Sequence, residues 1–261
     1  MVRGPLAGPL PTGQHHARAP RLATGTWPDV QEGILLVPVG STEQHGPHLP
    51  LETDTVIATA VTAELAQRAT SAGHRAYEAP ALPYGASGEH EDFPGTVSIG
   101  TSALVEVIVE LCRSASRWAN RIALVNGHGG NVEALRSAVP LLREEGRDVG
   151  WLSCVDVYAG ADLHAGLSET SLMLVLAALD VKMDRAEAGD CGVAETLLSE
   201  LRAQGVRAVS PNGVLGDPNG ASQAHGHEVL AGMCDAAWER FATWAPGAGG
   251  MLSSMPTGDS I

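Results

Sequence analysis

The stretch "ILLVPVGSTEQHGPHLPLETDTVIATAVTAELAQR", residues 34–68, changes its hydrophobic pattern twice. Its first six residues are apolar without alternation, which is typical of a strand that is buried on both faces of a sheet. From Asp54 onward the apolar residues recur at helical spacing, and Thr53 or Asp54 is suited to cap that helix. A buried strand that leads through a polar loop into a helix predicts one unit of a parallel α/β sheet.

The same alternation continues along the chain. Further strand patterns occur at 76–82, 121–127 and 149–157, and helical patterns at 101–118, 132–146, 168–179, 191–205 and 222–244. Thr101 or Ser102 is suited to begin the second helix, and Ser168 the fourth. Pro140 predicts a kink or a break in the third. We therefore expect a largely parallel sheet that is covered by helices on both faces.

The two ends of the chain differ from the middle. Residues 1–25 and 246–261 are rich in glycine and proline and carry no clear periodicity. We expect a flexible arm and a flexible tail there. No repeat or long linker interrupts the chain between them. Residues 26–245 are therefore predicted to form a single domain.

The composition bounds the class of protein. The chain has 261 residues, of which 44% are hydrophobic, so one α/β domain can bury a substantial core. Its net charge of -14 argues against a nucleic-acid partner, because binding to phosphates needs clustered lysine and arginine. Four scattered cysteines without a CxxC pair argue against a zinc finger or a disulfide framework. No segment reads as a secretion signal or a membrane span, so we expect a cytoplasmic protein without a membrane partner.

The polar loop after the first strand carries side chains that suit a metal ion. Glu43 and His45 are two residues apart, so in an extended chain both point to the same side. Asp54 returns at the start of the following helix. Two carboxylates and an imidazole suit a divalent cation such as Zn, Fe or Mn, although acids in this loop could instead cap the helix. The spacing favours the metal, and His48 and Glu52 are interpreted as ordinary loop residues.

Two later turns also follow strands directly. "NGHGGN", residues 126–131, places His128 among glycines, where a metal ligand or a phosphate cradle is conceivable. Its spacing matches no phosphate-binding motif, which favours the ligand. "DLHAGLSETS", residues 162–171, offers His164 and, five residues on, Glu169. Glu169 could equally serve the helix dipole in the first turn of its helix.

The segment "YGASGEHEDFPGT", residues 84–96, is too long and polar for a plain connection. Its four charged or imidazole residues, 89–92, could form a second metal patch. A loop that faces substrate, or a solvated acidic loop, is favoured instead. In open α/β sheets ligands bind at the carboxyl ends of strands. Four polar clusters after four predicted strands therefore indicate one active site.

Five motifs together resemble a known family. "GSTEQHGPHLPLETD", "YGASGEHEDFPGT", "NGHGGN", "HAGLSETS" and "NGVLGDPNGAS" are similar to the successive motifs of the creatininase amidohydrolase superfamily, over roughly residues 34–241. The resemblance implies a three-layer α/β/α sandwich with a mostly parallel central sheet. It also implies a homo-oligomer such as a hexamer and a metal-dependent hydrolase with two divalent metal ions in each subunit.

The resemblance implies specific ligands, with Asp54 bridging the two metals: Glu43, His45, Asp54 and His128. Creatininase has a glutamate two residues after the histidine of "NGH", where this chain has Gly130. This departure puts creatinine hydrolysis in doubt and leaves one ligand to be found. Glu169 is the candidate, with a part in catalysis as well. His164 matches the catalytic histidine of the family.

Within the superfamily the chain most resembles the branch of the mycofactocin system, which releases a C-terminal Val-Tyr dipeptide from a modified, ribosomally made precursor peptide. The backbone of Gly129 and Gly130 and the side chains of Ser87 and His90 would then help to hold the substrate. One alternative is a deformylase or cyclic-amide hydrolase acting on a small heterocycle, such as a creatinine-like compound or a formamidopyrimidine. Another is a non-catalytic scaffold with a structural metal.

Overall fold

The structure, a computed structural model, describes residues 19–154, 162–192, 201 and 204–254. Its centre is a four-stranded sheet of order β2-β1-β3-β4 in which every neighbouring pair is parallel. The strands are β1 (Gly33–Val39), β2 (Ala76–Glu78), β3 (Ala119–Asn126) and β4 (Val149–Ser153). All four predicted strands are confirmed, although residues 155–157 of the last one lie outside the described part of the chain.

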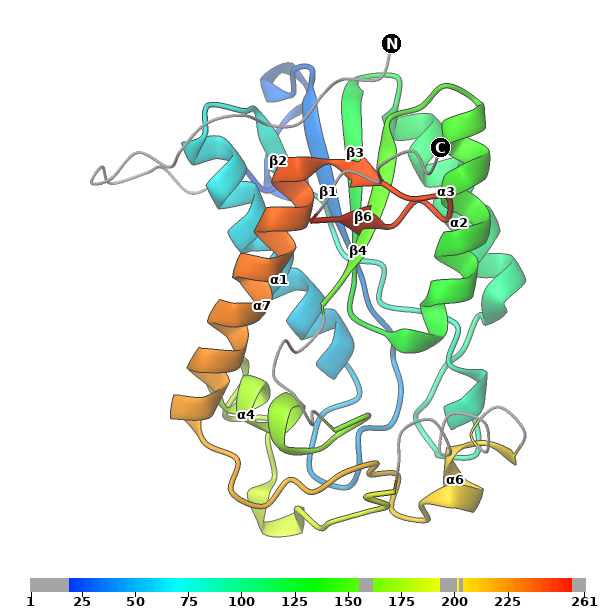
Figure 1. Cartoon of the computed structure of the whole chain (residues 1–261), viewed down its shortest axis with the longest axis vertical. Helices are drawn as coiled ribbons and strands as arrows, with labels where there is room; N and C mark the ends of the chain where they lie inside the picture. Colours follow the sequence, from blue (N-terminus) through cyan, green and yellow to red (C-terminus); the bar gives the residue numbers. More distant parts are fainter. Residues whose placement is uncertain (1–18, 155–161, 193–200, 202–203, 255–261) are drawn as a thin grey trace, which may run out of the picture.

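Helices cover both faces of this sheet (Figure 1). One face packs against α1 (Thr53–Ser71) and α7 (Gln223–Thr243), on which α4 (Leu167–Leu176) packs in turn. The other face packs against α2 (Gly100–Ala115) and α3 (Val132–Glu144). The three-layer α/β/α architecture predicted from the sequence is therefore confirmed. Shorter elements are η1 (Leu22–Thr24), η2 (Trp27–Asp29), η3 (Gly88–His90), η4 (Gly129–Asn131), η5 (Met183–Arg185), α6 (Val206–Val209), β5 (Ala245–Pro246) and β6 (Leu252–Ser253).

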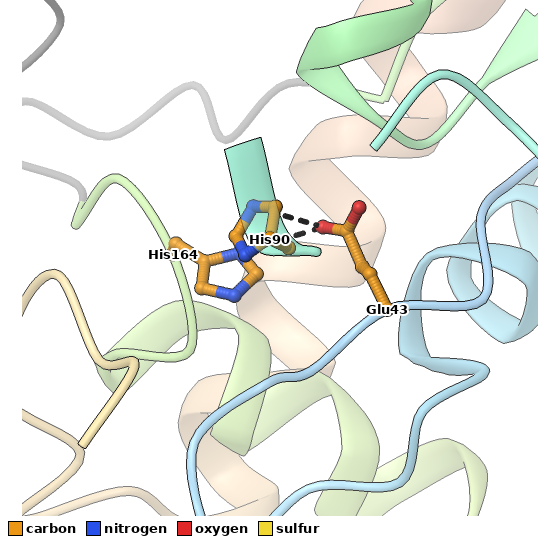
Figure 2. Close-up of side chains that lie close together, drawn as sticks. All are labelled: Glu43, His90 and His164. Atoms are coloured by element: carbon orange, nitrogen blue, oxygen red, sulfur yellow. Dashed lines mark ion pairs between the residues drawn. The ribbon is translucent and has the colours of Figure 1, made fainter. Parts of the chain in front are cut away.

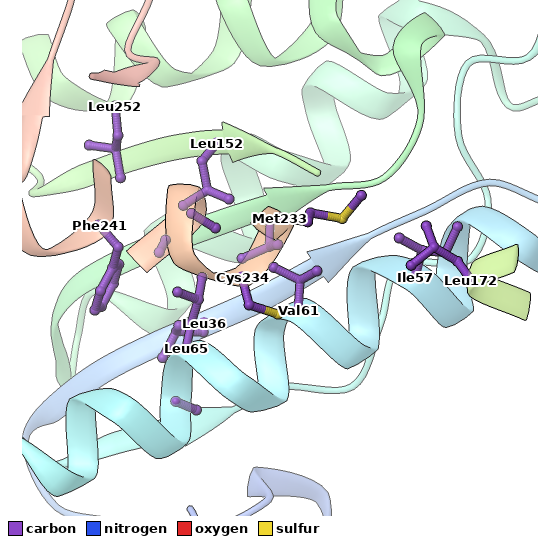
Figure 3. Packing of buried hydrophobic residues seen from close by; sticks show 14 of the residues in the cluster. Leu36, Ile57, Val61, Leu65, Leu152, Leu172, Met233, Cys234, Phe241 and Leu252 are labelled. Atoms are coloured by element: carbon purple, nitrogen blue, oxygen red, sulfur yellow. The ribbon is translucent and has the colours of Figure 1, made fainter. Parts of the chain in front are cut away.

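Neighbouring residues of β1 show why this strand is apolar throughout. Leu36 packs in one core with Leu65 of α1 and Phe241 of α7, as Figure 3 shows. Leu35 points to the opposite face and packs with Ile108 of α2. Since successive side chains of a strand alternate between faces, a central strand between two helical layers needs apolar residues at every position.

The predicted N-caps of three helices are wrong. The N-caps of α1, α2 and α4 are Glu52, Ile99 and Gly166, and within the described residues none of the three makes a side-chain capping hydrogen bond. Asp54 instead turns inward to an imidazole, and Ser168 is buried. By contrast, Ser222 is the N-cap of α7, and its side chain accepts a hydrogen bond from a backbone N–H three residues later.

Two expectations for interior segments have different outcomes. The helix α3 runs through Pro140 to Glu144, so the proline does not end it. The helix predicted at 191–205 lies mostly outside the described residues. Among the helices of the described part, none is both long and apolar enough to cross a bilayer.

Described residues at both ends of the chain pack against the domain. Arg21 forms a parallel bridge with Glu78 at the edge of the sheet, and Ala19 is buried. Near the other end, β6 pairs with β5, and Leu252 is buried against Gly150 of β4. Ordered packing thus extends beyond 26–245, while residues 1–18 and 255–261 are outside the description.

Candidate metal centre

Seven charged or imidazole side chains meet beyond the carboxyl ends of the strands. They come from the segments that follow β1, β2 and β3 and from the start of α4: Glu43, His45, Asp54, His90, His128, His164 and Glu169. Six of them are buried, and only the Glu169 side chain, at 26% exposure, reaches partly to solvent. Such a set of buried ionisable groups is rare in a protein interior unless they are paired or bind a cation.

The Glu43 carboxylate lies in the middle of three imidazoles. Its Oε1 atom is 3.4 Å from His90 Nε2 and 3.9 Å from His164 Nδ1, and its Oε2 atom is 3.2 Å from His128 Nε2. Figure 2 shows the rings of His90 and His164 beside this carboxylate. Glu43 therefore connects the segments that follow three different strands.

A second part of the cluster surrounds Asp54. Its Oδ1 atom is 3.1 Å from His45 Nε2, and its Oδ2 atom is 3.3 Å from His128 Nδ1. His45 Nε2 is also 3.9 Å from Glu169 Oε2, which accepts a hydrogen bond of 2.6 Å from the backbone N–H of Ala165. Because Asp54 touches both His45 and His128, it lies between the two parts of the cluster.

Two asparagines hold the turn that carries His128. The side-chain amide of Asn126 donates to the His128 carbonyl at 2.7 Å. Asn131 donates to the carbonyl of Gly40 at 2.9 Å and accepts from the N–H of Ala86 at 2.9 Å. The "NGHGGN" turn is thereby tied to the end of β1 and to the 84–96 loop, which fixes the position of His128 against Glu43 and Asp54.

The start of the α4 segment is fixed by a different pairing. His164 exchanges backbone hydrogen bonds with Leu215, which belongs to the "NGVLGDPNGAS" motif: Leu215 N donates to the His164 carbonyl at 2.9 Å, and His164 N donates back at 3.2 Å. This motif therefore helps to place the His164 ring beside Glu43.

The 84–96 loop divides between the cluster and solvent. Ser87 and His90 are buried, whereas Glu91 and Asp92 are exposed. Ser87 Oγ lies 3.3 Å from His128 Nε2 and makes a short hydrogen bond with Ser41 Oγ. The four charged or imidazole residues 89–92 therefore do not form one patch.

Gly130 has no room for a side chain. A Cβ atom there would press against the Ala86 carbonyl and His128 Nε2, and would lie 2.8 Å from Glu89 Oε1. That Glu89 oxygen is 3.6 Å from His128 Nε2. Glu89 thus occupies the space beside Gly130. Gly129, next to it, is exposed and marks an open side of the cluster.

Sequence reasoning gave Glu89 no individual role and missed Gln44 entirely. Glu89 shares a short 3-10 turn with His90, and Gln44 stands between two predicted ligands. Their places in the sequence, next to predicted site residues, were the signals that could have identified them. His48 and Glu52 stay outside the cluster, as expected: His48 Nε2 pairs with Thr170 Oγ1 at 2.8 Å, and Glu52 is exposed.

The carboxylates of the cluster attract positive charge. Burial alone would lower the pKa of His45, but Asp54 and other nearby carboxylates raise it to about 10. Burial also opposes charge on His128, whereas Glu43 and Asp54 hold its pKa well above the usual range. In turn, burial would raise the pKa of Glu43, but His128 and the neighbouring imidazoles keep it well below its ordinary value. The required positive charge can come from protons or from a bound cation.

Two other imidazoles favour the neutral form. Burial lowers the pKa of His90 to about 4 and holds the pKa of His164 well below its usual range. The nearby His45 adds to both effects. Burial also raises the pKa of Glu169. The cluster therefore combines charged carboxylates with a neutral imidazole that can bind a metal or accept a proton.

The residues present fit a divalent metal ion. Three sets of donor atoms lie within 4.8 Å of one another: Glu43, His90 and His164; His45, His164 and Glu169; and Glu43, His45 and Asp54. His128 adds a nitrogen close to Glu43 and another close to Asp54. Within the described part of the chain, both Glu43 oxygens and Asp54 Oδ2 are buried without a hydrogen-bond partner. Buried oxygens rarely remain so, which suits a cation between them.

Comparisons with known proteins agree with this geometry. The family model for creatininase, described as creatinine amidohydrolase, matches residues 23–241. The mycofactocin precursor peptide peptidase of Mycobacterium ulcerans (strain Agy99) is 51% identical over 232 residues, which cover 87% of this chain and 90% of the relative. Two solved structures, described as creatininase Mn and as a mutant creatininase of Zn-Zn type, are each 28% identical. Each comparison covers 86% of this chain and 99% of the other, with a TM-score of 0.68.

Proposed function

The chain belongs to the creatininase family, and from this premise we propose that it is a metal-dependent peptidase that releases the C-terminal Val-Tyr dipeptide from the modified mycofactocin precursor peptide. One observation carries the metal-dependent part: both Glu43 oxygens and Asp54 Oδ2 are buried near imidazoles and, among the described residues, accept no hydrogen bond. The 51% identity to a peptidase of that name, over most of both chains, supports the substrate.

Two divalent ions, Zn, Fe or Mn, are part of the proposal. Glu43 and His128 would hold one, His45 and Glu169 the other, and Asp54 would contact both, because its two oxygens face His45 and His128 separately. When bound, such ions supply Lewis acidity and lower the pKa of water, which makes a nucleophile available near neutral pH.

His164 would carry a proton between water and the leaving amine. Its Nδ1 atom is 3.9 Å from Glu43 Oε1, at the centre of the cluster. Burial holds the pKa of His164 well below its usual range, so the ring starts neutral and would readily pass a proton on to the leaving amine. Its backbone pairing with Leu215 holds the ring in place. A fixed general acid–base group of this kind contributes roughly 10²–10⁴-fold to the rate of amide cleavage.

The substrate would enter on the side marked by Gly129, which is exposed and next to His128. Backbone groups of Gly129 and Gly130 would line the entrance, with Ser87 and His90 deeper in the cluster, where both are buried. We also propose that the protein is a homo-oligomer, with a hexamer as the first expectation. A cytoplasmic location is part of the same proposal.

The alternative within the class is a hydrolase of a small amide, such as a creatinine-like ring or a formamidopyrimidine. The packing around Gly130 disfavours creatinine, because creatininase carries a glutamate at this position and this chain has no space for one. A non-catalytic scaffold is disfavoured by the partly exposed Glu169 beside His45, since a structural site would be closed by four protein ligands.

Mass spectrometry separates these functions. The purified, metal-loaded protein is incubated in parallel with the modified precursor peptide, with creatinine and with a formamidopyrimidine. The proposal expects free Val-Tyr dipeptide from the precursor and its loss in a His164→Ala variant, with Glu91→Gln in an exposed part of the 84–96 loop as the active control. If creatinine or the formamidopyrimidine is cleaved and the precursor peptide stays intact, the protein is a hydrolase of small amides and not a peptidase.

A further inference from the structure

The side chain of Gln44 is buried between two imidazoles of the cluster. Its amide nitrogen Nε2 lies 2.9 Å from His90 Nδ1 and 3.0 Å from His164 Nε2, and it is also 3.0 Å from the carbonyl oxygen of Gly213. Three neighbours thus compete for the two N–H groups of one amide. Which neighbours receive them decides where the protons of both imidazoles lie.

The orientation of the amide is determined by its other end. Gln44 Oε1 is 2.9 Å from the backbone N–H of Gly46, which can only donate, so the oxygen must be on that side. The amide nitrogen therefore faces the Gly213 carbonyl, which can only accept and takes the first N–H. Gly213 has φ +80, and a side chain there would collide with the Gln44 amide, so glycine allows this close approach.

His164 has its proton on Nε2. This nitrogen is 2.8 Å from the main-chain carbonyl oxygen of Gln44, an atom that only accepts. An Nε2 atom that donates there cannot accept the second N–H of the Gln44 side chain. The Nδ1 atom of a neutral His164 then has a free lone pair, and it is this atom that faces Glu43 Oε1 at 3.9 Å.

His90 receives the second amide N–H at Nδ1, which must therefore be bare. Unlike His164 Nε2, this atom has no carbonyl to donate to among the described residues, so a proton on it would leave both the ring N–H and the second amide N–H without an acceptor. The proton of a neutral His90 is then on Nε2, which faces the same Glu43 Oε1 atom at 3.4 Å. The two rings thus turn different ring nitrogens toward one carboxylate oxygen. His90 presents the N–H of Nε2, and His164 presents the lone pair of Nδ1.

We infer that Gln44 is a positioning residue that fixes His90 and His164 in the same neutral tautomer, with the proton on Nε2, while the two rings turn different nitrogens toward Glu43. His164 can then bind a metal or accept a proton at Nδ1, whereas His90 remains a hydrogen-bond donor toward Glu43 and toward a substrate oxygen. This gives different roles to two imidazoles that share one set of donor atoms with Glu43. The catalytic consequence rests on the proposed function, but the tautomers themselves do not.

Nitrogen-15 NMR of the full chain, labelled at histidine and loaded with zinc, tests the inference. Signals are assigned by their loss in His90→Gln and His164→Gln variants. We expect a bare Nδ1 and a protonated Nε2 for His90, and a protonated Nε2 with an unprotonated, bare or metal-bound Nδ1 for His164. A protonated Nδ1 on His90, or a proton on His164 Nδ1, in the wild-type protein would overturn the assignment, whatever the variants do.

A Gln44→Glu variant adds the causal test. A carboxylate accepts where the amide donated, so His90 is expected to gain a proton on Nδ1, and kcat to fall about 10- to 100-fold with bound zinc unchanged. Gln67→Glu, in α1 away from the cluster, is the matched control and should leave the His90 signals in place. Unchanged His90 signals in Gln44→Glu would contradict the role of Gln44. If the wild-type protein shows the expected tautomers but releases no dipeptide, the proposed peptidase activity is rejected and the role of Gln44 is not.

Discussion

At the scale of single residues, Glu169 is the proposed replacement for the glutamate ligand that this chain lacks at Gly130. Its Oε2 atom is 3.9 Å from His45 Nε2, while Glu89, beside Gly130, is 3.6 Å from His128 Nε2. Both carboxylates are therefore near the cluster, but Glu169 shares a set of donor atoms with His45 and His164.

A Glu169→Gln variant should lose about half of the bound metal, because an amide is a poorer ligand than a carboxylate for a divalent ion. Elemental analysis of the purified protein measures this, with Glu91→Gln as the control at an exposed site in the same chain. Full metal in Glu169→Gln and a loss in Glu89→Gln would move the assignment to Glu89.

His48 makes stability depend on pH. Burial lowers its pKa to about 4, so the folded protein keeps it neutral while the unfolded chain protonates it near its ordinary pKa of about 6.5. Its contribution to stability is complete above the unfolded pKa and is lost as the pH falls toward the folded one. The free energy of unfolding should therefore fall by up to about 1.4 kcal/mol per pH unit through this window.

Denaturant unfolding of the wild type and a His48→Gln variant between pH 7 and pH 4.5 checks this slope. The variant retains a polar group next to Thr170 but cannot titrate, so its curve should be flatter than that of the wild type. Parallel curves would show that His48 is protonated in the folded protein.

At the scale of elements, the turn after β3 depends on Asn131. Its amide satisfies the Gly40 carbonyl and the Ala86 N–H, both of which lie in other segments. An Asn131→Ala variant leaves these groups unpaired and should lower the free energy of unfolding by about 1–3 kcal/mol. Asn120→Ala in β3 removes an exposed hydrogen bond to Glu32 and should cost less than about 0.5 kcal/mol. Equal costs in urea unfolding would contradict this account of the turn.

The sequence predicts the strands better than the ends of helices. Every residue of β1 is buried, as its uninterrupted apolar run predicts for a central strand between two helical layers. The capping residues were predicted wrongly because Asp54 contacts His45 in the cluster and Ser168 is buried in the interior. A local sequence pattern carries no information on such contacts. The short strand β6 escaped prediction because tertiary packing of Leu252, rather than periodicity, creates it.

At the scale of the whole molecule, the parallel sheet explains why the site was predictable in outline. All four strands end at the same edge, so the polar turns that follow them were expected to converge. The meeting of Glu43, Asp54 and His128 follows that rule. The roles of Gln44 and Glu89 could not be predicted, because they depend on atomic distances across segments rather than on spacing within one motif.

The central claim is that the buried carboxylates and imidazoles form a metal centre. Its most direct test is the metal content of the purified chain and of a His45→Ala variant, measured by inductively coupled plasma mass spectrometry. The account predicts about two divalent ions per chain in the wild type and a clear loss in the variant, since His45 lies between Asp54 and Glu169. Less than one ion per chain, with no further loss in His45→Ala, would contradict it.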